Sequence, residues 1–413
     1  MGTKLLVATL VTLTLLIALP TTQAKTIVGA KVSKPLKTAL PALPLSANRT
    51  ESAAALHALH DFSIVTLRDG LSDQDPFEQL FVAGALGVNG DAIGPLMLED
   101  GFYSPDPSLR MASVDGLADI GDAKAVAVLQ RLFYRSSDGG KQRLALGGLT
   151  QIKDCTVIEP LLEAVEASDR GTRMEAAQAL GRAGCIEARR PLLVALSIER
   201  DPLTSTVIGN SLLMLGDNTA IPQLRTALER SSDEDVRVLA ALALGDARDP
   251  AMVKPLQAAL MGQDLEVKMS AAAALTHYDR RDGMKILKGA IVSKEYLVRH
   301  WLGELLERLD FGVGRDLLTD ALNSADPGLQ LAATKVIGLN GGDAEIGVLM
   351  RQFHRANDPI VRADVAWALG RIARPKCIEP LLDMIAQPEP AVRYTAADAL
   401  ARTTSRLLLE QAN

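Results

Sequence analysis

The chain has 413 residues and a formal net charge of −6; 48% of its residues are apolar, but only 3% are aromatic. A core so poor in aromatic residues has to be built from Ala and Leu, which suits a thin repeated core rather than one large globular core. Residues 1–46 hold five basic residues and no acid, which leaves 39 basic against 50 acidic residues in the rest. This excess of acid disfavours general binding of nucleic acid.

Residues 1–24 have the three parts of a secretory signal peptide. Lys4 is the only charge, an apolar run fills residues 5–19, and short polar and small residues lead to Ala24. A run of this length is short for a bilayer span. We therefore expect cleavage after Ala24, export to the periplasm or the medium, and no membrane span in the mature chain. The alternative is an uncleaved N-terminal membrane anchor.

Residues 25–46 contain four lysines and three prolines and read as a flexible linker. Residues 47–74 follow as an N-terminal capping segment, with an amphipathic helix expected near residues 51–68. From residue 75 to residue 413 the sequence is repetitive.

The repeats are marked by an acidic residue, here position 0, with Leu or Ile at position +11. Starts lie 31 or 32 residues apart, a period that indicates a stacked array. They are Asp75, Asp106, Asp138, Asp169, Asp201, Asp233, Asp264, Glu295, Asp326, Asp358 and Glu389. Asp is suited to begin a helix because its carboxylate accepts bonds from the first free amides. Gly at +12, as in Gly181 and Gly370, is expected to end that first helix.

A second helix follows in each repeat. Position +23 is Leu in all ten repeats that contain it, and position +27 is apolar, so both belong to one buried face. The eleventh repeat keeps only its first helix and a short tail. We predict an all-α solenoid, a right-handed superhelix of about eleven helix pairs.

The segment 358–385 carries Asp-Pro-Ile-Val-Arg, then Ala-Trp-Ala-Leu-Gly, then Ile-Glu-Pro-Leu-Leu. It resembles a HEAT repeat, and most closely the Ala-rich variety called PBS-lyase HEAT-like repeats. The resemblance covers residues 75–413 and implies the fold. Scaffolds, bilin lyases and an iron-dependent hydroxylase share such repeats, so it implies little about function.

Arg recurs at +4, for example Arg237, Arg299 and Arg362. Because +4 shares a helix face with +11, we expect a structural role in which its head pairs with turn carboxylates such as Asp122 or Asp343. Bulky residues break the pattern at Tyr278 and Trp301. They are interpreted as filling a gap in the core, with a partner-binding anchor as the alternative.

The cysteines are candidates for a disulfide, and two of the histidines are candidates for a metal site. Cys155 and Cys185 occupy turns of neighbouring repeats; helices stack about 8–10 Å apart, beyond the reach of a disulfide, so we expect free thiols, with a disulfide as the alternative. His57 and His60 with Asp61 are too few for a metal site. We expect no catalytic residue, no metal and no cofactor.

The residues on the face of the second helices opposite the core stripe change character along the array. Acidic residues flank a basic central stretch formed by Arg190, Arg225, Lys254, Lys285 and Lys288. In HEAT arrays second helices line the concave side, so this stretch is expected to face the groove and to bind a protein or peptide; its positive charge suits an acidic one. The function predicted is a non-enzymatic scaffold or adaptor. The alternative is an enzyme or a bilin-lyase-type accessory protein, and the oligomeric state is left open.

Overall fold

The structure, a computed structural model, describes residues 49–412. The proposed signal peptide and linker lie outside these residues. The described chain is helical, with no strand among residues 49–412, and forms an α-solenoid, as the periodicity predicts. It divides into two compact units: unit 1 combines residues 49–97 with 334–412, and unit 2 comprises residues 98–333.

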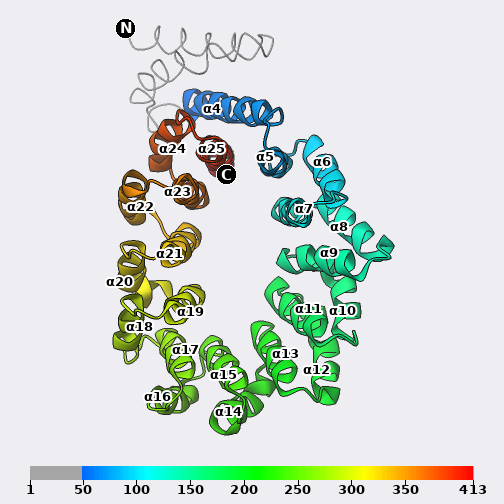
Figure 1. Cartoon of the computed structure of the whole chain (residues 1–413), viewed down its shortest axis with the longest axis vertical. Coiled ribbons are helices and arrows are strands. Elements are labelled where there is room, and N and C mark those ends of the chain that lie inside the picture. Colours follow the sequence, from blue (N-terminus) through cyan, green and yellow to red (C-terminus); the bar gives the residue numbers. More distant parts are fainter. Residues whose placement is uncertain (1–48, 413) are drawn as a thin grey trace. The chain divides into compact units, whose positions relative to one another are not determined.

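Ten helix pairs, preceded by α4 (Arg49–Gly70) and followed by α25 (Pro390–Ala412), make up the described residues (Figure 1). The first helices of the pairs are α5 (Pro76–Val88), α7 (Pro107–Ile120), α9 (Gly139–Gln151), α11 (Arg170–Ala183), α13 (Pro202–Met214), α15 (Glu234–Asp246), α17 (Leu265–Thr276), α19 (Tyr296–Leu306), α21 (Pro327–Asn340) and α23 (Pro359–Ile372). The second helices are α6 (Ile93–Phe102), α8 (Ala123–Arg135), α10 (Ile158–Val165), α12 (Arg189–Ile198), α14 (Ile221–Arg230), α16 (Val253–Leu260), α18 (Met284–Ile291), α20 (Phe311–Leu322), α22 (Asp343–Arg355) and α24 (Ile378–Ile385).

The acidic residue at position 0 begins most of the first helices as expected. The carboxylate of Asp75 accepts from the amide of Phe77 at 2.9 Å, and that of Asp201 accepts from Thr204 at 2.8 Å. Each bond satisfies an amide that has no partner within the helix. The leucines at +23 are equally regular, since all ten are at most 1% exposed. The two-helix repeat and its core stripe are therefore confirmed.

The glycines at +12 do not end the first helices, so that prediction was wrong. Gly181, Gly245, Gly338 and Gly370 lie inside α11, α15, α21 and α23. A Cβ on Gly245 would stand 2.8 Å from the Cα of Ala274, and one on Gly181 would stand 2.8 Å from the Cα of Ser211. Glycine is needed at these positions because neighbouring first helices approach too closely for a side chain.

This close approach also determines the curvature of unit 2. Neighbouring first helices such as α13 and α15 are in extensive contact, whereas neighbouring second helices such as α14 and α16 touch sparsely. Within unit 2 the first helices therefore lie on the concave side and the second helices on the convex side (Figure 1). The expectation that second helices line the concave side is wrong here, because Ala, Ser and Gly make the first-helix layer the thinner one.

The arginines at +4 join successive repeats. Arg237 binds Asp264 at 3.0 Å, Arg299 binds Asp326 at 2.6 Å, and both also donate to carbonyls of the preceding loop. The structural role is confirmed, but the partners are not the turn carboxylates named above. Asp122 and its equivalents follow the far end of the first helix, about 18 Å from position +4 at 1.5 Å per residue.

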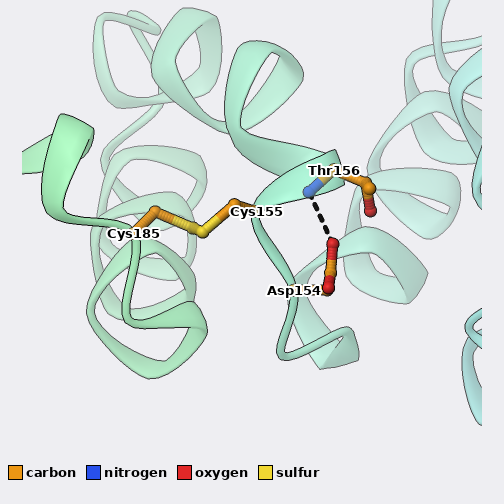
Figure 2. The surroundings of a disulfide bond; sticks show 4 residues. All are labelled: Asp154, Cys155, Thr156 and Cys185. Atoms are coloured by element: carbon orange, nitrogen blue, oxygen red, sulfur yellow. Dashed lines mark hydrogen bonds between the residues drawn. A yellow bond between two sulfur atoms is a disulfide. The ribbon is translucent and has the colours of Figure 1, made fainter.

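Cys155 and Cys185 form a disulfide, with Cα atoms 5.4 Å apart (Figure 2). The expectation of free thiols was wrong because the spacing between helix axes does not apply to them. Cys155 begins a 3-10 turn (Cys155–Val157) before α10, and Cys185 precedes the equivalent turn (Ile186–Ala188) before α12. The Cα atoms of the two cysteines in these turns lie closer together than the axes of stacked helices usually do. The disulfide thus joins two successive repeats of unit 2.

In unit 1 the helix expected near residues 51–68 is α4, and it packs along α25 (Figure 1). Tyr394 of α25 is 3% exposed and donates a hydrogen bond to Asp73 at 3.0 Å. A Cβ on Gly70 would stand 2.8 Å from the Tyr394 ring. His60 of α4 lies 3.3 Å from the hydroxyl of Ser405. We call this packing of α4 on α25 the terminal contact; it joins the N-terminal capping segment to the helix of the eleventh repeat.

Candidate functional site

The five basic residues singled out from the sequence lie on four successive second helices of unit 2. Arg190 is on α12, Arg225 on α14, Lys254 on α16, and Lys285 and Lys288 are on α18; all five are exposed. We call them the basic row. Because second helices form the convex side of unit 2, the basic row lies on its outer surface and not in its groove.

Ion pairs divide the basic row into two groups. Arg225 binds Glu229 at 2.8 Å and Lys288 binds Asp320 at 3.3 Å, with all four side chains between 37% and 52% exposed. Such exposed pairs contribute little stability and are easily exchanged for another partner. Arg190, Lys254 and Lys285 have no ion-pair partner among residues 49–412. These three cations are therefore available to an anionic group.

Exposed aromatic side chains lie at or just after the ends of second helices that precede the basic row. Tyr134 at the end of α8 is 51% exposed, and burial of its phenol together with the neighbouring charge of Glu163 raises the pKa of Tyr134. Tyr103, one repeat earlier, is 60% exposed and has the ammonium of Lys141 5.7 Å from its ring centre. The surface is thus mixed in character, polar and aromatic at one end and basic in the middle.

Tyr278 and Trp301 belong to the core. Both pack against the hydrophobic cluster that surrounds Leu244, and the Tyr278 hydroxyl donates to the carbonyl of Leu244 at 2.5 Å. Burial and the nearby acids Asp249 and Asp246 raise the pKa of Tyr278 to about 12, so the hydroxyl keeps its proton. The gap-filling interpretation is favoured over the anchor for a partner.

Sequence reasoning missed a polar network at the ends of the first helices. Asp246, His277 and Arg308 occupy position +13 in three successive repeats. The His277 ring nitrogen Nε2 lies 2.7 Å from the Arg308 carbonyl, and the Arg308 guanidinium lies 3.5 Å from Asp246. Comparison of the residues at position +13 in successive repeats would have revealed these three residues. The bonds run between repeats, so the network stabilises their stacking.

Metal-binding and membrane-spanning features are both absent from the described residues. Between residues 49 and 412 no group of three His, Cys, Asp or Glu side chains is close enough together to hold a metal ion. Over the same residues, none of the helices has both the length and the apolar character needed to cross a bilayer.

Comparison with known families identifies the repeat. The profile described as HEAT repeats matches residues 189–276, 221–307 and 346–411, which lie within the repeats defined above. The chain is a HEAT-repeat protein. The narrower assignment to PBS-lyase HEAT-like repeats stays a prediction.

A HEAT repeat-containing taxis protein from Halobacterium salinarum is 30% identical over 167 residues. The matched region spans 40% of this HEAT-repeat protein and 38% of that relative, so it covers well under half of either chain. The similarity supports the repeat and does not extend to the relative's role.

Solved structures of HEAT-type arrays are also similar, at low scores. The complex of CpcE and CpcF of phycocyanin lyase from Nostoc sp. PCC7120 is 16% identical, with 67% of this chain and 93% of that chain covered and a TM-score of 0.36. Human deoxyhypusine hydroxylase is 18% identical, with 70% and 96% covered and a TM-score of 0.30. Kap121p is 11% identical, with 95% and 51% covered and a TM-score of 0.34. At these scores the likenesses carry no argument about function.

Proposed function

We propose that this HEAT-repeat protein is an exported, non-enzymatic scaffold that binds another protein along the outer surface of its repeats. The single observation that carries the proposal is the basic row, in which exposed cations recur on four successive second helices of unit 2. A surface that repeats with the array suits an extended partner, because each repeat offers one more contact of the same kind.

The chemistry of the basic row favours an acidic partner segment. Arg190, Lys254 and Lys285 offer unpaired positive charge, and the paired Arg225 and Lys288 exchange their carboxylates at small cost. Complementary charge of this kind mainly raises the rate and the specificity of association. We therefore expect binding that weakens as salt is added.

Two observations support export. The first 24 residues have the order of a signal peptide. The Cys155–Cys185 disulfide, which joins two repeats, suits an oxidising compartment such as the periplasm, because cytosolic thiols are kept reduced. Mass spectrometry of the native protein is expected to find Lys25 at the mature N-terminus and two cysteines without a free thiol. An intact residue 1 in a soluble cytosolic fraction would refute export.

Binding through the basic row is tested by capture of partners from the native compartment. Lys254→Glu combined with Lys285→Glu should weaken capture, more so at low salt, and leave thermal stability unchanged. Lys124→Glu with Lys153→Glu is the matched control, since both lysines are exposed, lie off the row, and change the net charge equally. Equal capture by wild type and by the double variant on the row would exclude this surface.

The alternative function, an enzyme or a lyase-type accessory protein, rests on the repeat resemblance alone. Residues of the kind that a catalytic site needs would have to converge from several repeats. The network of Asp246, His277 and Arg308 does converge, but its groups bind one another across repeats. The scaffold is therefore the function that the geometry supports best.

A further inference from the structure

Two neighbouring inter-repeat loops of unit 2 carry large apolar side chains that face solvent. Met261 and Leu265 lie on either side of one loop, and Val292 lies before the next loop, with Tyr296 and Leu297 after it. Their exposed fractions are 83%, 43%, 80%, 63% and 74% in that order. We call these five residues the apolar edge. Single exposed apolar residues are common on proteins, but a group of them marks an interaction surface.

The five side chains form one patch because they occupy equivalent positions in adjacent repeats. Met261 and Val292 are both at +28, while Leu265 and Tyr296 are both at +1 of the repeat that follows. Stacked helices lie about 8–10 Å apart, so equivalent residues are near neighbours. Only these two loops in the sequence place large apolar residues, other than proline, at both positions.

The exposed apolar residues of the edge are not explained by a role in starting the helices that follow them. Most acidic residues at position 0 cap the helix that follows, but the side chains of Asp264 and Glu295 make no capping bond. Asp264 is instead held by Arg237. The Tyr296 ring stacks on His300, with centroids 5.8 Å apart and planes 11° apart, which keeps an exposed aromatic ring in one orientation. The two loops that carry the apolar edge therefore lack the side-chain capping bonds found at most first helices, and one aromatic ring of the edge is stacked on a neighbour.

Negative charge borders the apolar edge on one side. Glu234 and Asp235 begin α15, and Glu266 follows Leu265 in the first turn of α17. Asp235 and Glu266 are both at +2 of successive repeats, and their helices α15 and α17 are in contact, so these carboxylates lie near one another. Partial burial and then the charges of Glu234 and Asp235 raise the pKa of Glu266, in keeping with this arrangement. None of the three has an ion-pair partner between residues 49 and 412. Lys294 and Glu295, adjacent within the second loop, offset each other.

We propose that the apolar edge and these three carboxylates bind a basic, amphipathic segment of a partner protein. Apolar side chains of that segment contact Val292, Tyr296 and Leu297, and its Lys or Arg residues reach Glu234, Asp235 and Glu266. The charge of this surface is opposite to that of the basic row, so the two select different segments. The inference rests on the proposed function only in that it treats the chain as a protein-binding scaffold.

The test uses the full chain and a fluorescent synthetic peptide with leucines on one helical face and lysines at one end. Saturable binding is expected, with a Kd that rises with salt. Val292→Ser with Leu297→Ser should raise the Kd at least about tenfold, because the apolar contact is lost while the net charge of the surface is unchanged. Glu234→Gln with Glu266→Gln should raise it less. Ile198→Ser is the control: Ile198 is 71% exposed in the same unit but lies off the edge.

The proposal is overturned if the peptide fails to bind, if the Val292–Leu297 variant binds it as wild type does, or if replacing the peptide lysines by glutamates leaves the Kd unchanged. Self-association that the same double variant abolishes would make the edge an interface between copies and also overturn the proposal. If wild type captures partners from the native compartment and the Val292–Leu297 variant captures the same ones, the inference about the apolar edge fails but the proposed scaffold function does not. If wild type captures none, the proposed function fails.

Discussion

Unit 2 is joined by contacts that recur, whereas the terminal contact of unit 1 uses residues that occur once. In unit 2, Arg237 binds Asp264 and Arg299 binds Asp326, which is the same pair of repeat positions two repeats further along the array. In unit 1, the Tyr394 hydroxyl binds Asp73, 321 residues away in the chain. A recurrent contact spreads stability over the repeats. A unique contact concentrates it in a few side chains, so the two should respond differently to single substitutions.

The largest effect is expected in the core of unit 2. Leu256→Ala should lower the free energy of unfolding by about 2–5 kcal/mol, because Leu256 is 0% exposed and the cavity borders the Leu244 cluster. It should also separate the unfolding of the repeats on either side, since repeats contact only their neighbours. Denaturant unfolding followed by circular dichroism measures this. A single, unshifted transition would contradict it.

The disulfide of unit 2 comes next. Cys155→Ser with Cys185→Ser should lower the free energy of unfolding by about 2–4 kcal/mol, since the bridge closes a loop of 30 residues in the unfolded chain. Thermal melts of the variant and of reduced wild type should coincide. Cys377→Ser is a useful comparison because that buried thiol is unpaired. Insensitivity of wild type to reductant would show that the bridge adds no stability.

Unit 1 contains a half-buried carboxylate, Asp364, which should make the stability of the protein depend on pH. Burial, reinforced by Asp358, raises the pKa of Asp364 on α23 from 3.8 to about 6. A raised pKa means that its contribution to stability is full below about pH 4 and is lost as pH rises through 6. Asp364→Asn should therefore stabilise the protein by about 1–3 kcal/mol at pH 8 and by little at pH 4. Equal shifts at both pH values would refute the assignment.

The smallest effect is expected at the terminal contact. Tyr394→Phe keeps the ring against Gly70 and removes the hydrogen bond to Asp73, at a cost of about 0.5–1.5 kcal/mol. Hydrogen exchange should report faster opening of α4 and α25 and little change in unit 2. Tyr296→Phe, at an exposed site of unit 2, is the control. Uniform destabilisation of both units would show that the contact is not local.

The sequence predicted the structural features that are determined within one repeat. It did not predict the features that depend on how closely neighbouring repeats approach one another. Leucines at +11 and +23 are buried, and Asp at position 0 caps helices, because both effects act within a few residues. Gly245 was misread as a helix end because only the approach of α17 explains it. The Cys155–Cys185 bridge and the concave side depend in the same way on how closely neighbouring repeats stack.

The candidate surfaces were predicted in part. Arg190, Lys254 and Lys285 are exposed on one layer of helices, but the side of unit 2 was misjudged since curvature follows from packing between repeats. The apolar edge was not found, although Met261, Leu265, Val292 and Tyr296 fall at two fixed repeat positions. From the sequence alone, apolar residues are assigned to the core, and only the structure shows which of them are exposed.

Binding of another protein at the basic row and at the apolar edge is tested most directly by photo-crosslinking in the native compartment. A photoreactive residue placed at Lys254 or at Leu297 should give a discrete adduct with another protein, while the same residue at Lys124 should give none. No adduct at either position, or the same adducts at all three, would contradict the account.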